Sequence, residues 1–163
     1  MKTKFLVLIF ALLFLFTACG QKDTVSTTVP FTEVTWDSSL DQICEAEGTN
    51  YEKSLSMAGG NNYIYPSQYL EYDGFIQYNI DDSDKLCGIS WYYIGNDHAT
   101  VNGIYEAIVK HTSSLLGQVE PIDSSNIHSG YKWETEDCNV YLIAFAQNEE
   151  YAVQISYLIK DEK

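Results

Sequence analysis

Apolar residues are concentrated in one long run at the start of the chain. Residues 5–16 are all apolar, and they follow the charged Lys2 and Lys4. A helix needs about 20 apolar residues to cross a bilayer, so this run is too short to span one. A charged start, a short apolar core and the small residues Thr17 and Ala18 are typical of a secretory signal peptide. We therefore expect residues 1–18 to be absent from the mature protein.

Two later segments show the apolar period of a helix. In the first, Leu40, Ile43 and Cys44 form a narrow stripe, and Gly48 supplies a natural end. The second segment has a longer stripe, which continues until Gly117. This stripe consists of Val101, Ile104, Tyr105, Ile108, Val109, Thr112, Leu115 and Leu116.

Strand candidates fill most of the remaining chain, and the last of them alternates between apolar and polar residues as a half-buried strand does. They are residues 54–58, 63–72, 75–80, 86–94, 131–135, 140–146 and 151–159. Pro66 interrupts the second candidate and favours an edge strand. Residues 118–130 are expected to form a loop.

The order helix, strands, helix, strands lacks the long crossovers of a parallel sheet. It predicts an α+β fold, in which two helices pack on one face of an antiparallel sheet of about five to six strands. The single globular domain is expected over residues 36–163. Residues 19–35 are mostly polar and predict a flexible tether.

The cysteine at the expected cleavage site makes the predicted localisation more specific. Residues 15–19, Leu-Phe-Thr-Ala-Cys, resemble the lipobox of bacterial lipoproteins, although Phe16 stands where leucine is usual. The resemblance implies that Cys19 carries a diacylglycerol and anchors the protein to the extracytoplasmic face of a cell membrane. An outer membrane fits equally well if the host has one. The alternative is an ordinary signal peptide cut near Ala18.

The mature chain is strongly acidic. The formal charge of the whole chain is −14, and loss of the two positive charges of Lys2 and Lys4 lowers it to −16. The sequence contains no arginine, the residue best suited to bind phosphate in a bidentate way. Together these features exclude nucleic acid as a partner.

Three cysteines remain if Cys19 is lipidated, namely Cys44, Cys87 and Cys138. An odd number allows at most one intramolecular disulfide, and the sequence does not choose the pair. The alternative is that these residues are free thiols, with Cys44 and Cys87 buried and Cys138 exposed in a polar turn.

Catalytic and metal-binding patterns are missing from the sequence. Neither a Gly-x-Ser-x-Gly elbow nor a His-Glu-x-x-His motif occurs, and His98, His111 and His128 lie in separate regions. The acidic residues 81–84 lack the central glycine of a calcium loop and predict a solvated turn. We therefore expect no catalytic residue, no metal and no cofactor.

Aromatic residues stand out in number, with 13 tyrosines and three tryptophans. Tyrosine and tryptophan are favoured on recognition surfaces because they bury much area and lose little side-chain entropy. The alternative is that most of them pack the core. The residues predicted to include an exposed aromatic patch are Tyr72, Tyr78, Tyr92, Trp133 and Tyr141.

The order of elements, with Trp36 before the first helix and Gly48 after it, resembles the architecture of the β-lactamase inhibitor protein. Small outer-membrane assembly lipoproteins are a more distant likeness. Neither resemblance carries site residues to this chain. The first hypothesis is a non-enzymatic lipoprotein that binds a protein or a cell-wall ligand through its sheet face or loops. Two alternatives are an inhibitor of a secreted enzyme and a small envelope hydrolase.

Overall fold

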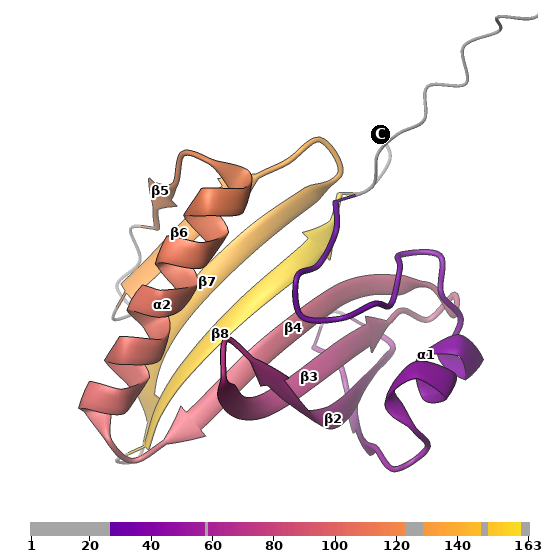
Figure 1. The fold of residues 1–163 in the computed structure, drawn as a ribbon. Coiled ribbons are helices and arrows are strands. Elements are labelled where there is room, and N and C mark those ends of the chain that lie inside the picture. Colours follow the sequence, from indigo (N-terminus) through magenta and orange to yellow (C-terminus); the bar gives the residue numbers. More distant parts are fainter. Residues whose placement is uncertain (1–26, 58, 123–128, 148–149, 161–163) are drawn as a thin grey trace, which may run out of the picture.

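The computed structural model describes residues 27–57, 59–122, 129–147 and 150–160 (Figure 1). The signal peptide, Cys19 and His128 lie outside these residues. The first half of the chain forms α1 (Leu40–Glu47), β1 (Glu52–Leu55), β2 (Asn61–Tyr69), β3 (Tyr72–Ile80) and β4 (Leu86–Gly95). The second half forms α2 (His98–Leu116), β5 (Glu120–Pro121), β6 (Ser129–Glu134), β7 (Cys138–Gln147) and β8 (Glu150–Ile159).

The strands form one eight-stranded antiparallel sheet in the order β1-β2-β3-β4-β8-β7-β6-β5. The expectation of two helices packed on a sheet of about five to six strands is therefore wrong, because the fold is dominated by its sheet. Strand β5 has two residues and lies in the segment expected to be a loop. Strand β2 accepts Pro66 because β1 pairs only with residues 61–64, so the proline faces no strand on that side.

The two halves of the sheet have the same connectivity. Each half is one helix followed by four strands, and the last strands of the two halves, β4 and β8, pair at the centre. Because this pairing is antiparallel, an approximate two-fold axis normal to the sheet relates the halves. The Ser90 hydroxyl donates a hydrogen bond of 2.9 Å to the Ser156 hydroxyl at this central pair.

Both helices begin and end at residues that cap them. The Ser39 hydroxyl caps α1 by accepting from the Gln42 backbone N–H, and the Gln42 side-chain oxygen accepts from the Ser39 backbone N–H. The Asp97 side chain caps α2, which ends at Gly117. Five residues of the predicted stripe are buried, whereas Leu115, which the stripe also included, is exposed. The buried residues are Val101, Ile104, Tyr105, Ile108 and Thr112.

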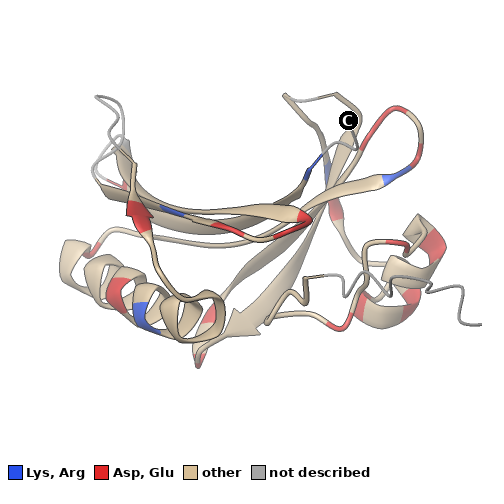
Figure 2. Ribbon diagram, turned by 90° about the horizontal axis from the view of Figure 1, so that it is seen from above, with Lys and Arg blue, Asp and Glu red and all other residues tan. Residues whose placement is uncertain are grey.

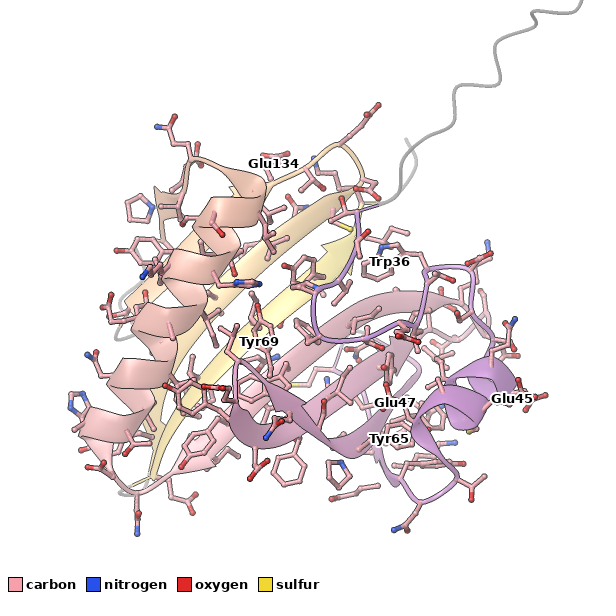
Figure 3. The ribbon with its side chains drawn as sticks, viewed as in Figure 1. Trp36, Glu45, Glu47, Tyr65, Tyr69 and Glu134 are labelled. Atoms are coloured by element: carbon pink, nitrogen blue, oxygen red, sulfur yellow. The ribbon has the colours of Figure 1, made fainter. Side chains whose placement is uncertain are left out.

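One face of the sheet carries all the covering elements. Helix α2 packs over β4, β6, β7 and β8, and α1 lies on the same side near β2 and β3 (Figures 1 and 2). The core between them is made of large side chains, among them Trp91, Trp133 and Ile43, which have almost no exposed surface. The other face has no helix over it in Figure 2.

Residues 27–36, here called the strap, cross the covered face between the two helices (Figure 1). Val29 and Val34 are buried in the core, with exposed fractions of 3% and 8%. The ring of Phe31 packs edge-on against Tyr69 and Tyr157, at centroid distances of 5.1 Å and 5.7 Å. The tether expected over residues 19–35 is thus corrected: its residues 27–35 belong to the folded domain.

The N-terminal end of the strap, at Thr27, is hydrogen-bonded to the turn between β6 and β7. The Thr27 backbone N–H donates a 2.7 Å hydrogen bond to the carboxylate of Asp137, and the Thr27 hydroxyl donates another. The indole N–H of Trp36 in turn donates to the Thr27 carbonyl at 3.0 Å. Burial of Asp137 acts to raise its pKa, but hydrogen bonds from Thr27 and Thr135 outweigh it, and the pKa lies below its usual value.

The anchoring of the strap is expected to weaken in acid. A lowered pKa contributes stability that is complete above the unfolded value of 3.8 and is lost as the pH falls through the folded value. We expect the urea midpoint of the wild type to fall further than that of Asp137→Asn between about pH 5 and about pH 2. Other carboxylates titrate equally in both proteins, so the difference isolates Asp137. Parallel pH profiles would contradict this assignment.

Candidate functional site

The uncovered side of the sheet, here called the open face, carries the side chains that alternate with the core residues along each strand. Its apolar members are Ile64, Pro66, Phe75, Tyr92, Ile94, Tyr141, Ile143, Phe145 and Leu158. Its uncharged polar members at the centre include Gln77, Ser90, Gln154 and Ser156. Several of the apolar side chains are well exposed: Ile94 by 50%, Phe75 by 41% and Phe145 by 37%.

An aromatic pair lies on the β3 and β4 part of this face. Phe75 and Tyr92 are directly opposite each other in the β3–β4 register, and their rings stack at 5.5 Å with an angle of 26° between planes. Pro66 continues the row on β2, while Gln154 and Ile143 continue it on β8 and β7. Neighbouring strands are about 4.8 Å apart, so this row is continuous across five strands.

Acidic residues surround this uncharged centre. The alternation along the strands places Glu52, Asp73, Glu120, Glu134 and Glu150 on the open face. Burial raises the pKa of Tyr92, and the nearby Glu52 carboxylate raises it further. Red segments recur along the strand ends in Figure 2. An apolar centre with a polar rim is the usual anatomy of a protein–protein interface.

The lysines on this side are held by a single carboxylate. Glu134 accepts from Lys160 at 2.8 Å and from Lys132 at 3.4 Å. The hydrogen bond from Lys160 and the charge of Lys132 lower the pKa of Glu134, so it stays ionised. Because both lysines already pair with Glu134, they do little to offset the negative charge of the other carboxylates on the open face.

The structure divides the five predicted aromatic residues between the two sides of the sheet. Tyr92 and Tyr141 lie half-buried on the open face. Tyr78 and Trp133 have exposed fractions of 0% and 1% and belong to the core, so they are not available to a partner. Tyr72 is opposite the buried Tyr69 and packs against the same core.

Sequence reasoning missed the exposed apolar residues that accompany Tyr92. Phe75, Ile94 and Phe145 occupy positions whose alternation puts them opposite the core residues of the same strands. The alternation along β3 already indicated that Phe75 and Tyr78 face opposite sides of the sheet, since they are an odd number of residues apart. The pattern alone could not tell which side the helices cover.

The three cysteines that the structure describes, Cys44, Cys87 and Cys138, are thiols and form no disulfide with one another. The expectation that Cys138 is the exposed one is wrong, because it begins β7 with its side chain in the core. Burial and the nearby Asp137 carboxylate raise the pKa of this thiol to about 12, which keeps it protonated and unreactive.

The residues expected to form an acidic turn do so. The Asp81 carboxylate accepts hydrogen bonds from the backbone N–H groups of Ser83 and Lys85, at 2.8 Å and 2.9 Å. Within the described residues, no group of three or more acidic, histidine or cysteine side chains is arranged to hold a metal ion. The described helices include none with the length and apolar character needed to span a membrane.

Comparisons with protein-family models, with curated proteins and with solved structures found no match to this chain. The likeness to the β-lactamase inhibitor protein therefore stays a prediction. The geometry of the open face carries the functional argument that follows.

Proposed function

We propose that this protein is a lipid-anchored extracytoplasmic binding protein, which uses the open face to hold a basic protein and has no catalytic role. The observation that carries the proposal is the bare sheet face, with the exposed apolar residues Phe75, Ile94 and Phe145 on it and carboxylates near the strand ends. Exposed apolar residues gathered on one surface of a soluble domain are typical of a binding site.

Charge supports a basic partner. The mature chain has a formal charge of −16 after loss of Lys2 and Lys4 from the total of −14. Complementary charge speeds association and disfavours acidic partners. A basic protein would place its cations against Glu52 and Asp73 and its apolar residues against Phe75 and Tyr92.

The lipid on Cys19 would keep this encounter close to the membrane. Only a short segment separates Cys19 from Thr27, where the strap is fixed to the domain. At about 3.3–3.6 Å per residue, this segment reaches at most roughly 30 Å. Two acyl chains or more hold a protein stably at the membrane, whereas one chain does not. The partner is therefore expected at or near the same membrane.

The test is photo-crosslinking on intact cells, with the crosslinking residue placed at position 75 or, as a control, at position 115. Leu115 is an exposed apolar residue on α2, with an exposed fraction of 54%, and lies away from the open face. We expect position 75 to capture one basic protein, and Tyr92→Asp to reduce the yield at least about tenfold because a charge enters the apolar centre. Added salt should reduce it as well.

Two outcomes would overturn the proposal. Equal capture from positions 75 and 115 would show that the open face has no special role. Capture of an acidic protein, or of cell-wall polysaccharide alone, would contradict the charge argument. In the same cells, Cys19→Ala should release the protein from the membrane fraction; retention of this variant would contradict the lipid anchor without affecting the binding face.

A further inference from the structure

A pocket of about 270 Å³ lies between the N-terminal half of α2 and the sheet. Helix α2 contributes His98, Val101, Asn102 and Tyr105 to its wall. Strands β6, β7 and β8 contribute Ser129, Ala144, Phe145, Tyr151 and Ala152. The pocket lies mainly on the side of the sheet that α2 covers, at the end of β7 and β8, although Phe145 and Ala152 alternate to the open face.

Four of the nine residues in the wall of this pocket carry rings, namely His98, Tyr105, Phe145 and Tyr151. The rings of His98 and Tyr151 meet edge to face at 4.9 Å, and Tyr105 stacks on Tyr131 at 5.9 Å. Rings arranged in this way present edges and faces that favour a further ring by edge-to-face or offset contact. Ala144 contributes only a methyl group to the wall.

The polar groups of the wall include no carboxylate and no amine. Asn102 offers an amide, Ser129 a hydroxyl and His98 an imidazole. Burial raises the pKa of Tyr105 to about 12, so its phenol also stays neutral. None of the lining residues is Asp, Glu or Lys, although the chain as a whole is strongly acidic. A neutral ligand that can form hydrogen bonds suits this wall better than an ion.

The volume limits the size of the ligand. A dry cavity of about 150 Å³ holds benzene, whereas pockets for drug-sized molecules have about 300–1,000 Å³. A pocket of 270 Å³ therefore has room for one or two fused rings.

The pocket also lies far from the membrane tether. The strap is fixed at Asp137, beside the first residue of β7, whereas Phe145 and Tyr151 lie at the other end of the β7–β8 pair. At about 3.4 Å per residue, seven residues of β7 separate the two sites by roughly 24 Å. Figure 1 shows the start of α2 and the start of the strap at opposite ends of the sheet. Molecules from outside the membrane can therefore reach the pocket.

We propose that this pocket binds a neutral aromatic ring with a hydrogen-bonding group, of the size of an indole or a phenol. The ring inserts between Tyr105 and Tyr151, and its polar group pairs with Asn102 or Ser129. Such a ring could belong to a free aromatic molecule or to a tryptophan or tyrosine side chain of a polypeptide. Both sources present the same chemistry to the pocket.

Titration calorimetry on the intact protein in detergent tests this proposal with three probes: indole, N-acetyltryptophanamide and a capped Gly-Trp-Gly peptide. We expect indole to bind with a dissociation constant of about 1 mM or below. Asn102→Ala should weaken this binding about tenfold, and Ala144→Leu should abolish it by filling the pocket. Asn50→Ala, which changes an exposed asparagine in a loop, is the matched control and should bind as the wild type does.

The probes separate the two sources. Tighter binding of the peptide than of indole would assign the pocket to a side chain presented by a polypeptide, and the reverse would assign it to a free aromatic molecule. The proposal fails if the wild type binds none of the probes, or if Asn102→Ala and Asn50→Ala bind indole equally well. Asn102 is exposed on α2, so its variant tests the pocket even if Ala144→Leu does not fold.

Discussion

A chain that begins at Trp36 will be much less stable than one that begins at Thr27. The shorter chain lacks Val29 and Val34, which are almost fully buried, and Phe31, which packs between Tyr69 and Tyr157. Burial of a valine side chain contributes about 1.5–3 kcal/mol, so the two valines alone account for about 3–6 kcal/mol. A typical domain has a total stability of only about 5–15 kcal/mol.

The loss extends beyond apolar burial. The Thr32 hydroxyl lies 2.7 Å from the hydroxyl of the buried Tyr78, which donates to the Glu47 carboxylate. Removal of the strap takes away one member of this network and opens the other two to water. Burial raises the pKa of Tyr78, and a carboxylate beside it raises it further, so the phenol remains a donor. This network ties α1 to the sheet through the strap.

Urea unfolding followed by tryptophan fluorescence measures the difference, since both chains retain Trp36, Trp91 and Trp133. A chain that begins at Gly20 is the control, and it should match the chain that begins at Thr27 within about 0.5 kcal/mol. Equal midpoints for the chains that begin at Thr27 and Trp36 would mean that the strap is only a tether, as its composition suggested.

The second large effect is expected at Gly74 on β3. A Cβ atom there would lie 2.5 Å from Cζ2 of Trp91 and 2.6 Å from the carbonyl oxygen of Tyr92. The indole could move only by displacing the core around it, and the carbonyl belongs to the centre of the sheet. Overpacking of this kind costs about 1–3 kcal/mol and occasionally more, so Gly74→Ala should lose about 3 kcal/mol.

Gly103→Ala provides the matched control for that substitution. Gly103 lies inside α2, is exposed, and has no atom within 4 Å of the place where a Cβ would stand. Alanine favours a helix over glycine by about 1 kcal/mol, so this variant should be more stable than the wild type. Thermal unfolding of the two variants should therefore shift in opposite directions. A shift of the same sign in both would contradict the packing of Trp91 over Gly74.

The two helices were predictable because their signals are local. The stripe of α2 and its ends at Asp97 and Gly117 follow from period and capping chemistry within one segment. The two-residue strand β5 is too short for a pattern to emerge, and β1 shares only its last two residues with the candidate strand 54–58. Both strands form against the edge of a longer neighbour. Half of the strap's residues are polar and no regular period marks it, so only packing against the covered face of the sheet makes Val29 and Val34 core residues.

The candidate face was predictable in part for the same reason. Alternation places Tyr92 on the side opposite Trp91, and the structure agrees. Alternation could not tell that Tyr92 lies on the open face and Tyr78 in the core, because which side is bare depends on where α2 and the strap lie. Trp133 pairs with Val140 under α2, a contact between distant parts of the chain that no local pattern encodes.

The pairing of β4 with β8 has a further consequence for how the two halves depend on each other. Each half of the chain supplies one helix and four strands, and the two halves meet only along this antiparallel seam within the sheet. Either half alone would leave its last strand as an unpaired edge, which is a template for pairing with another chain. Each half therefore protects the other from association through that edge.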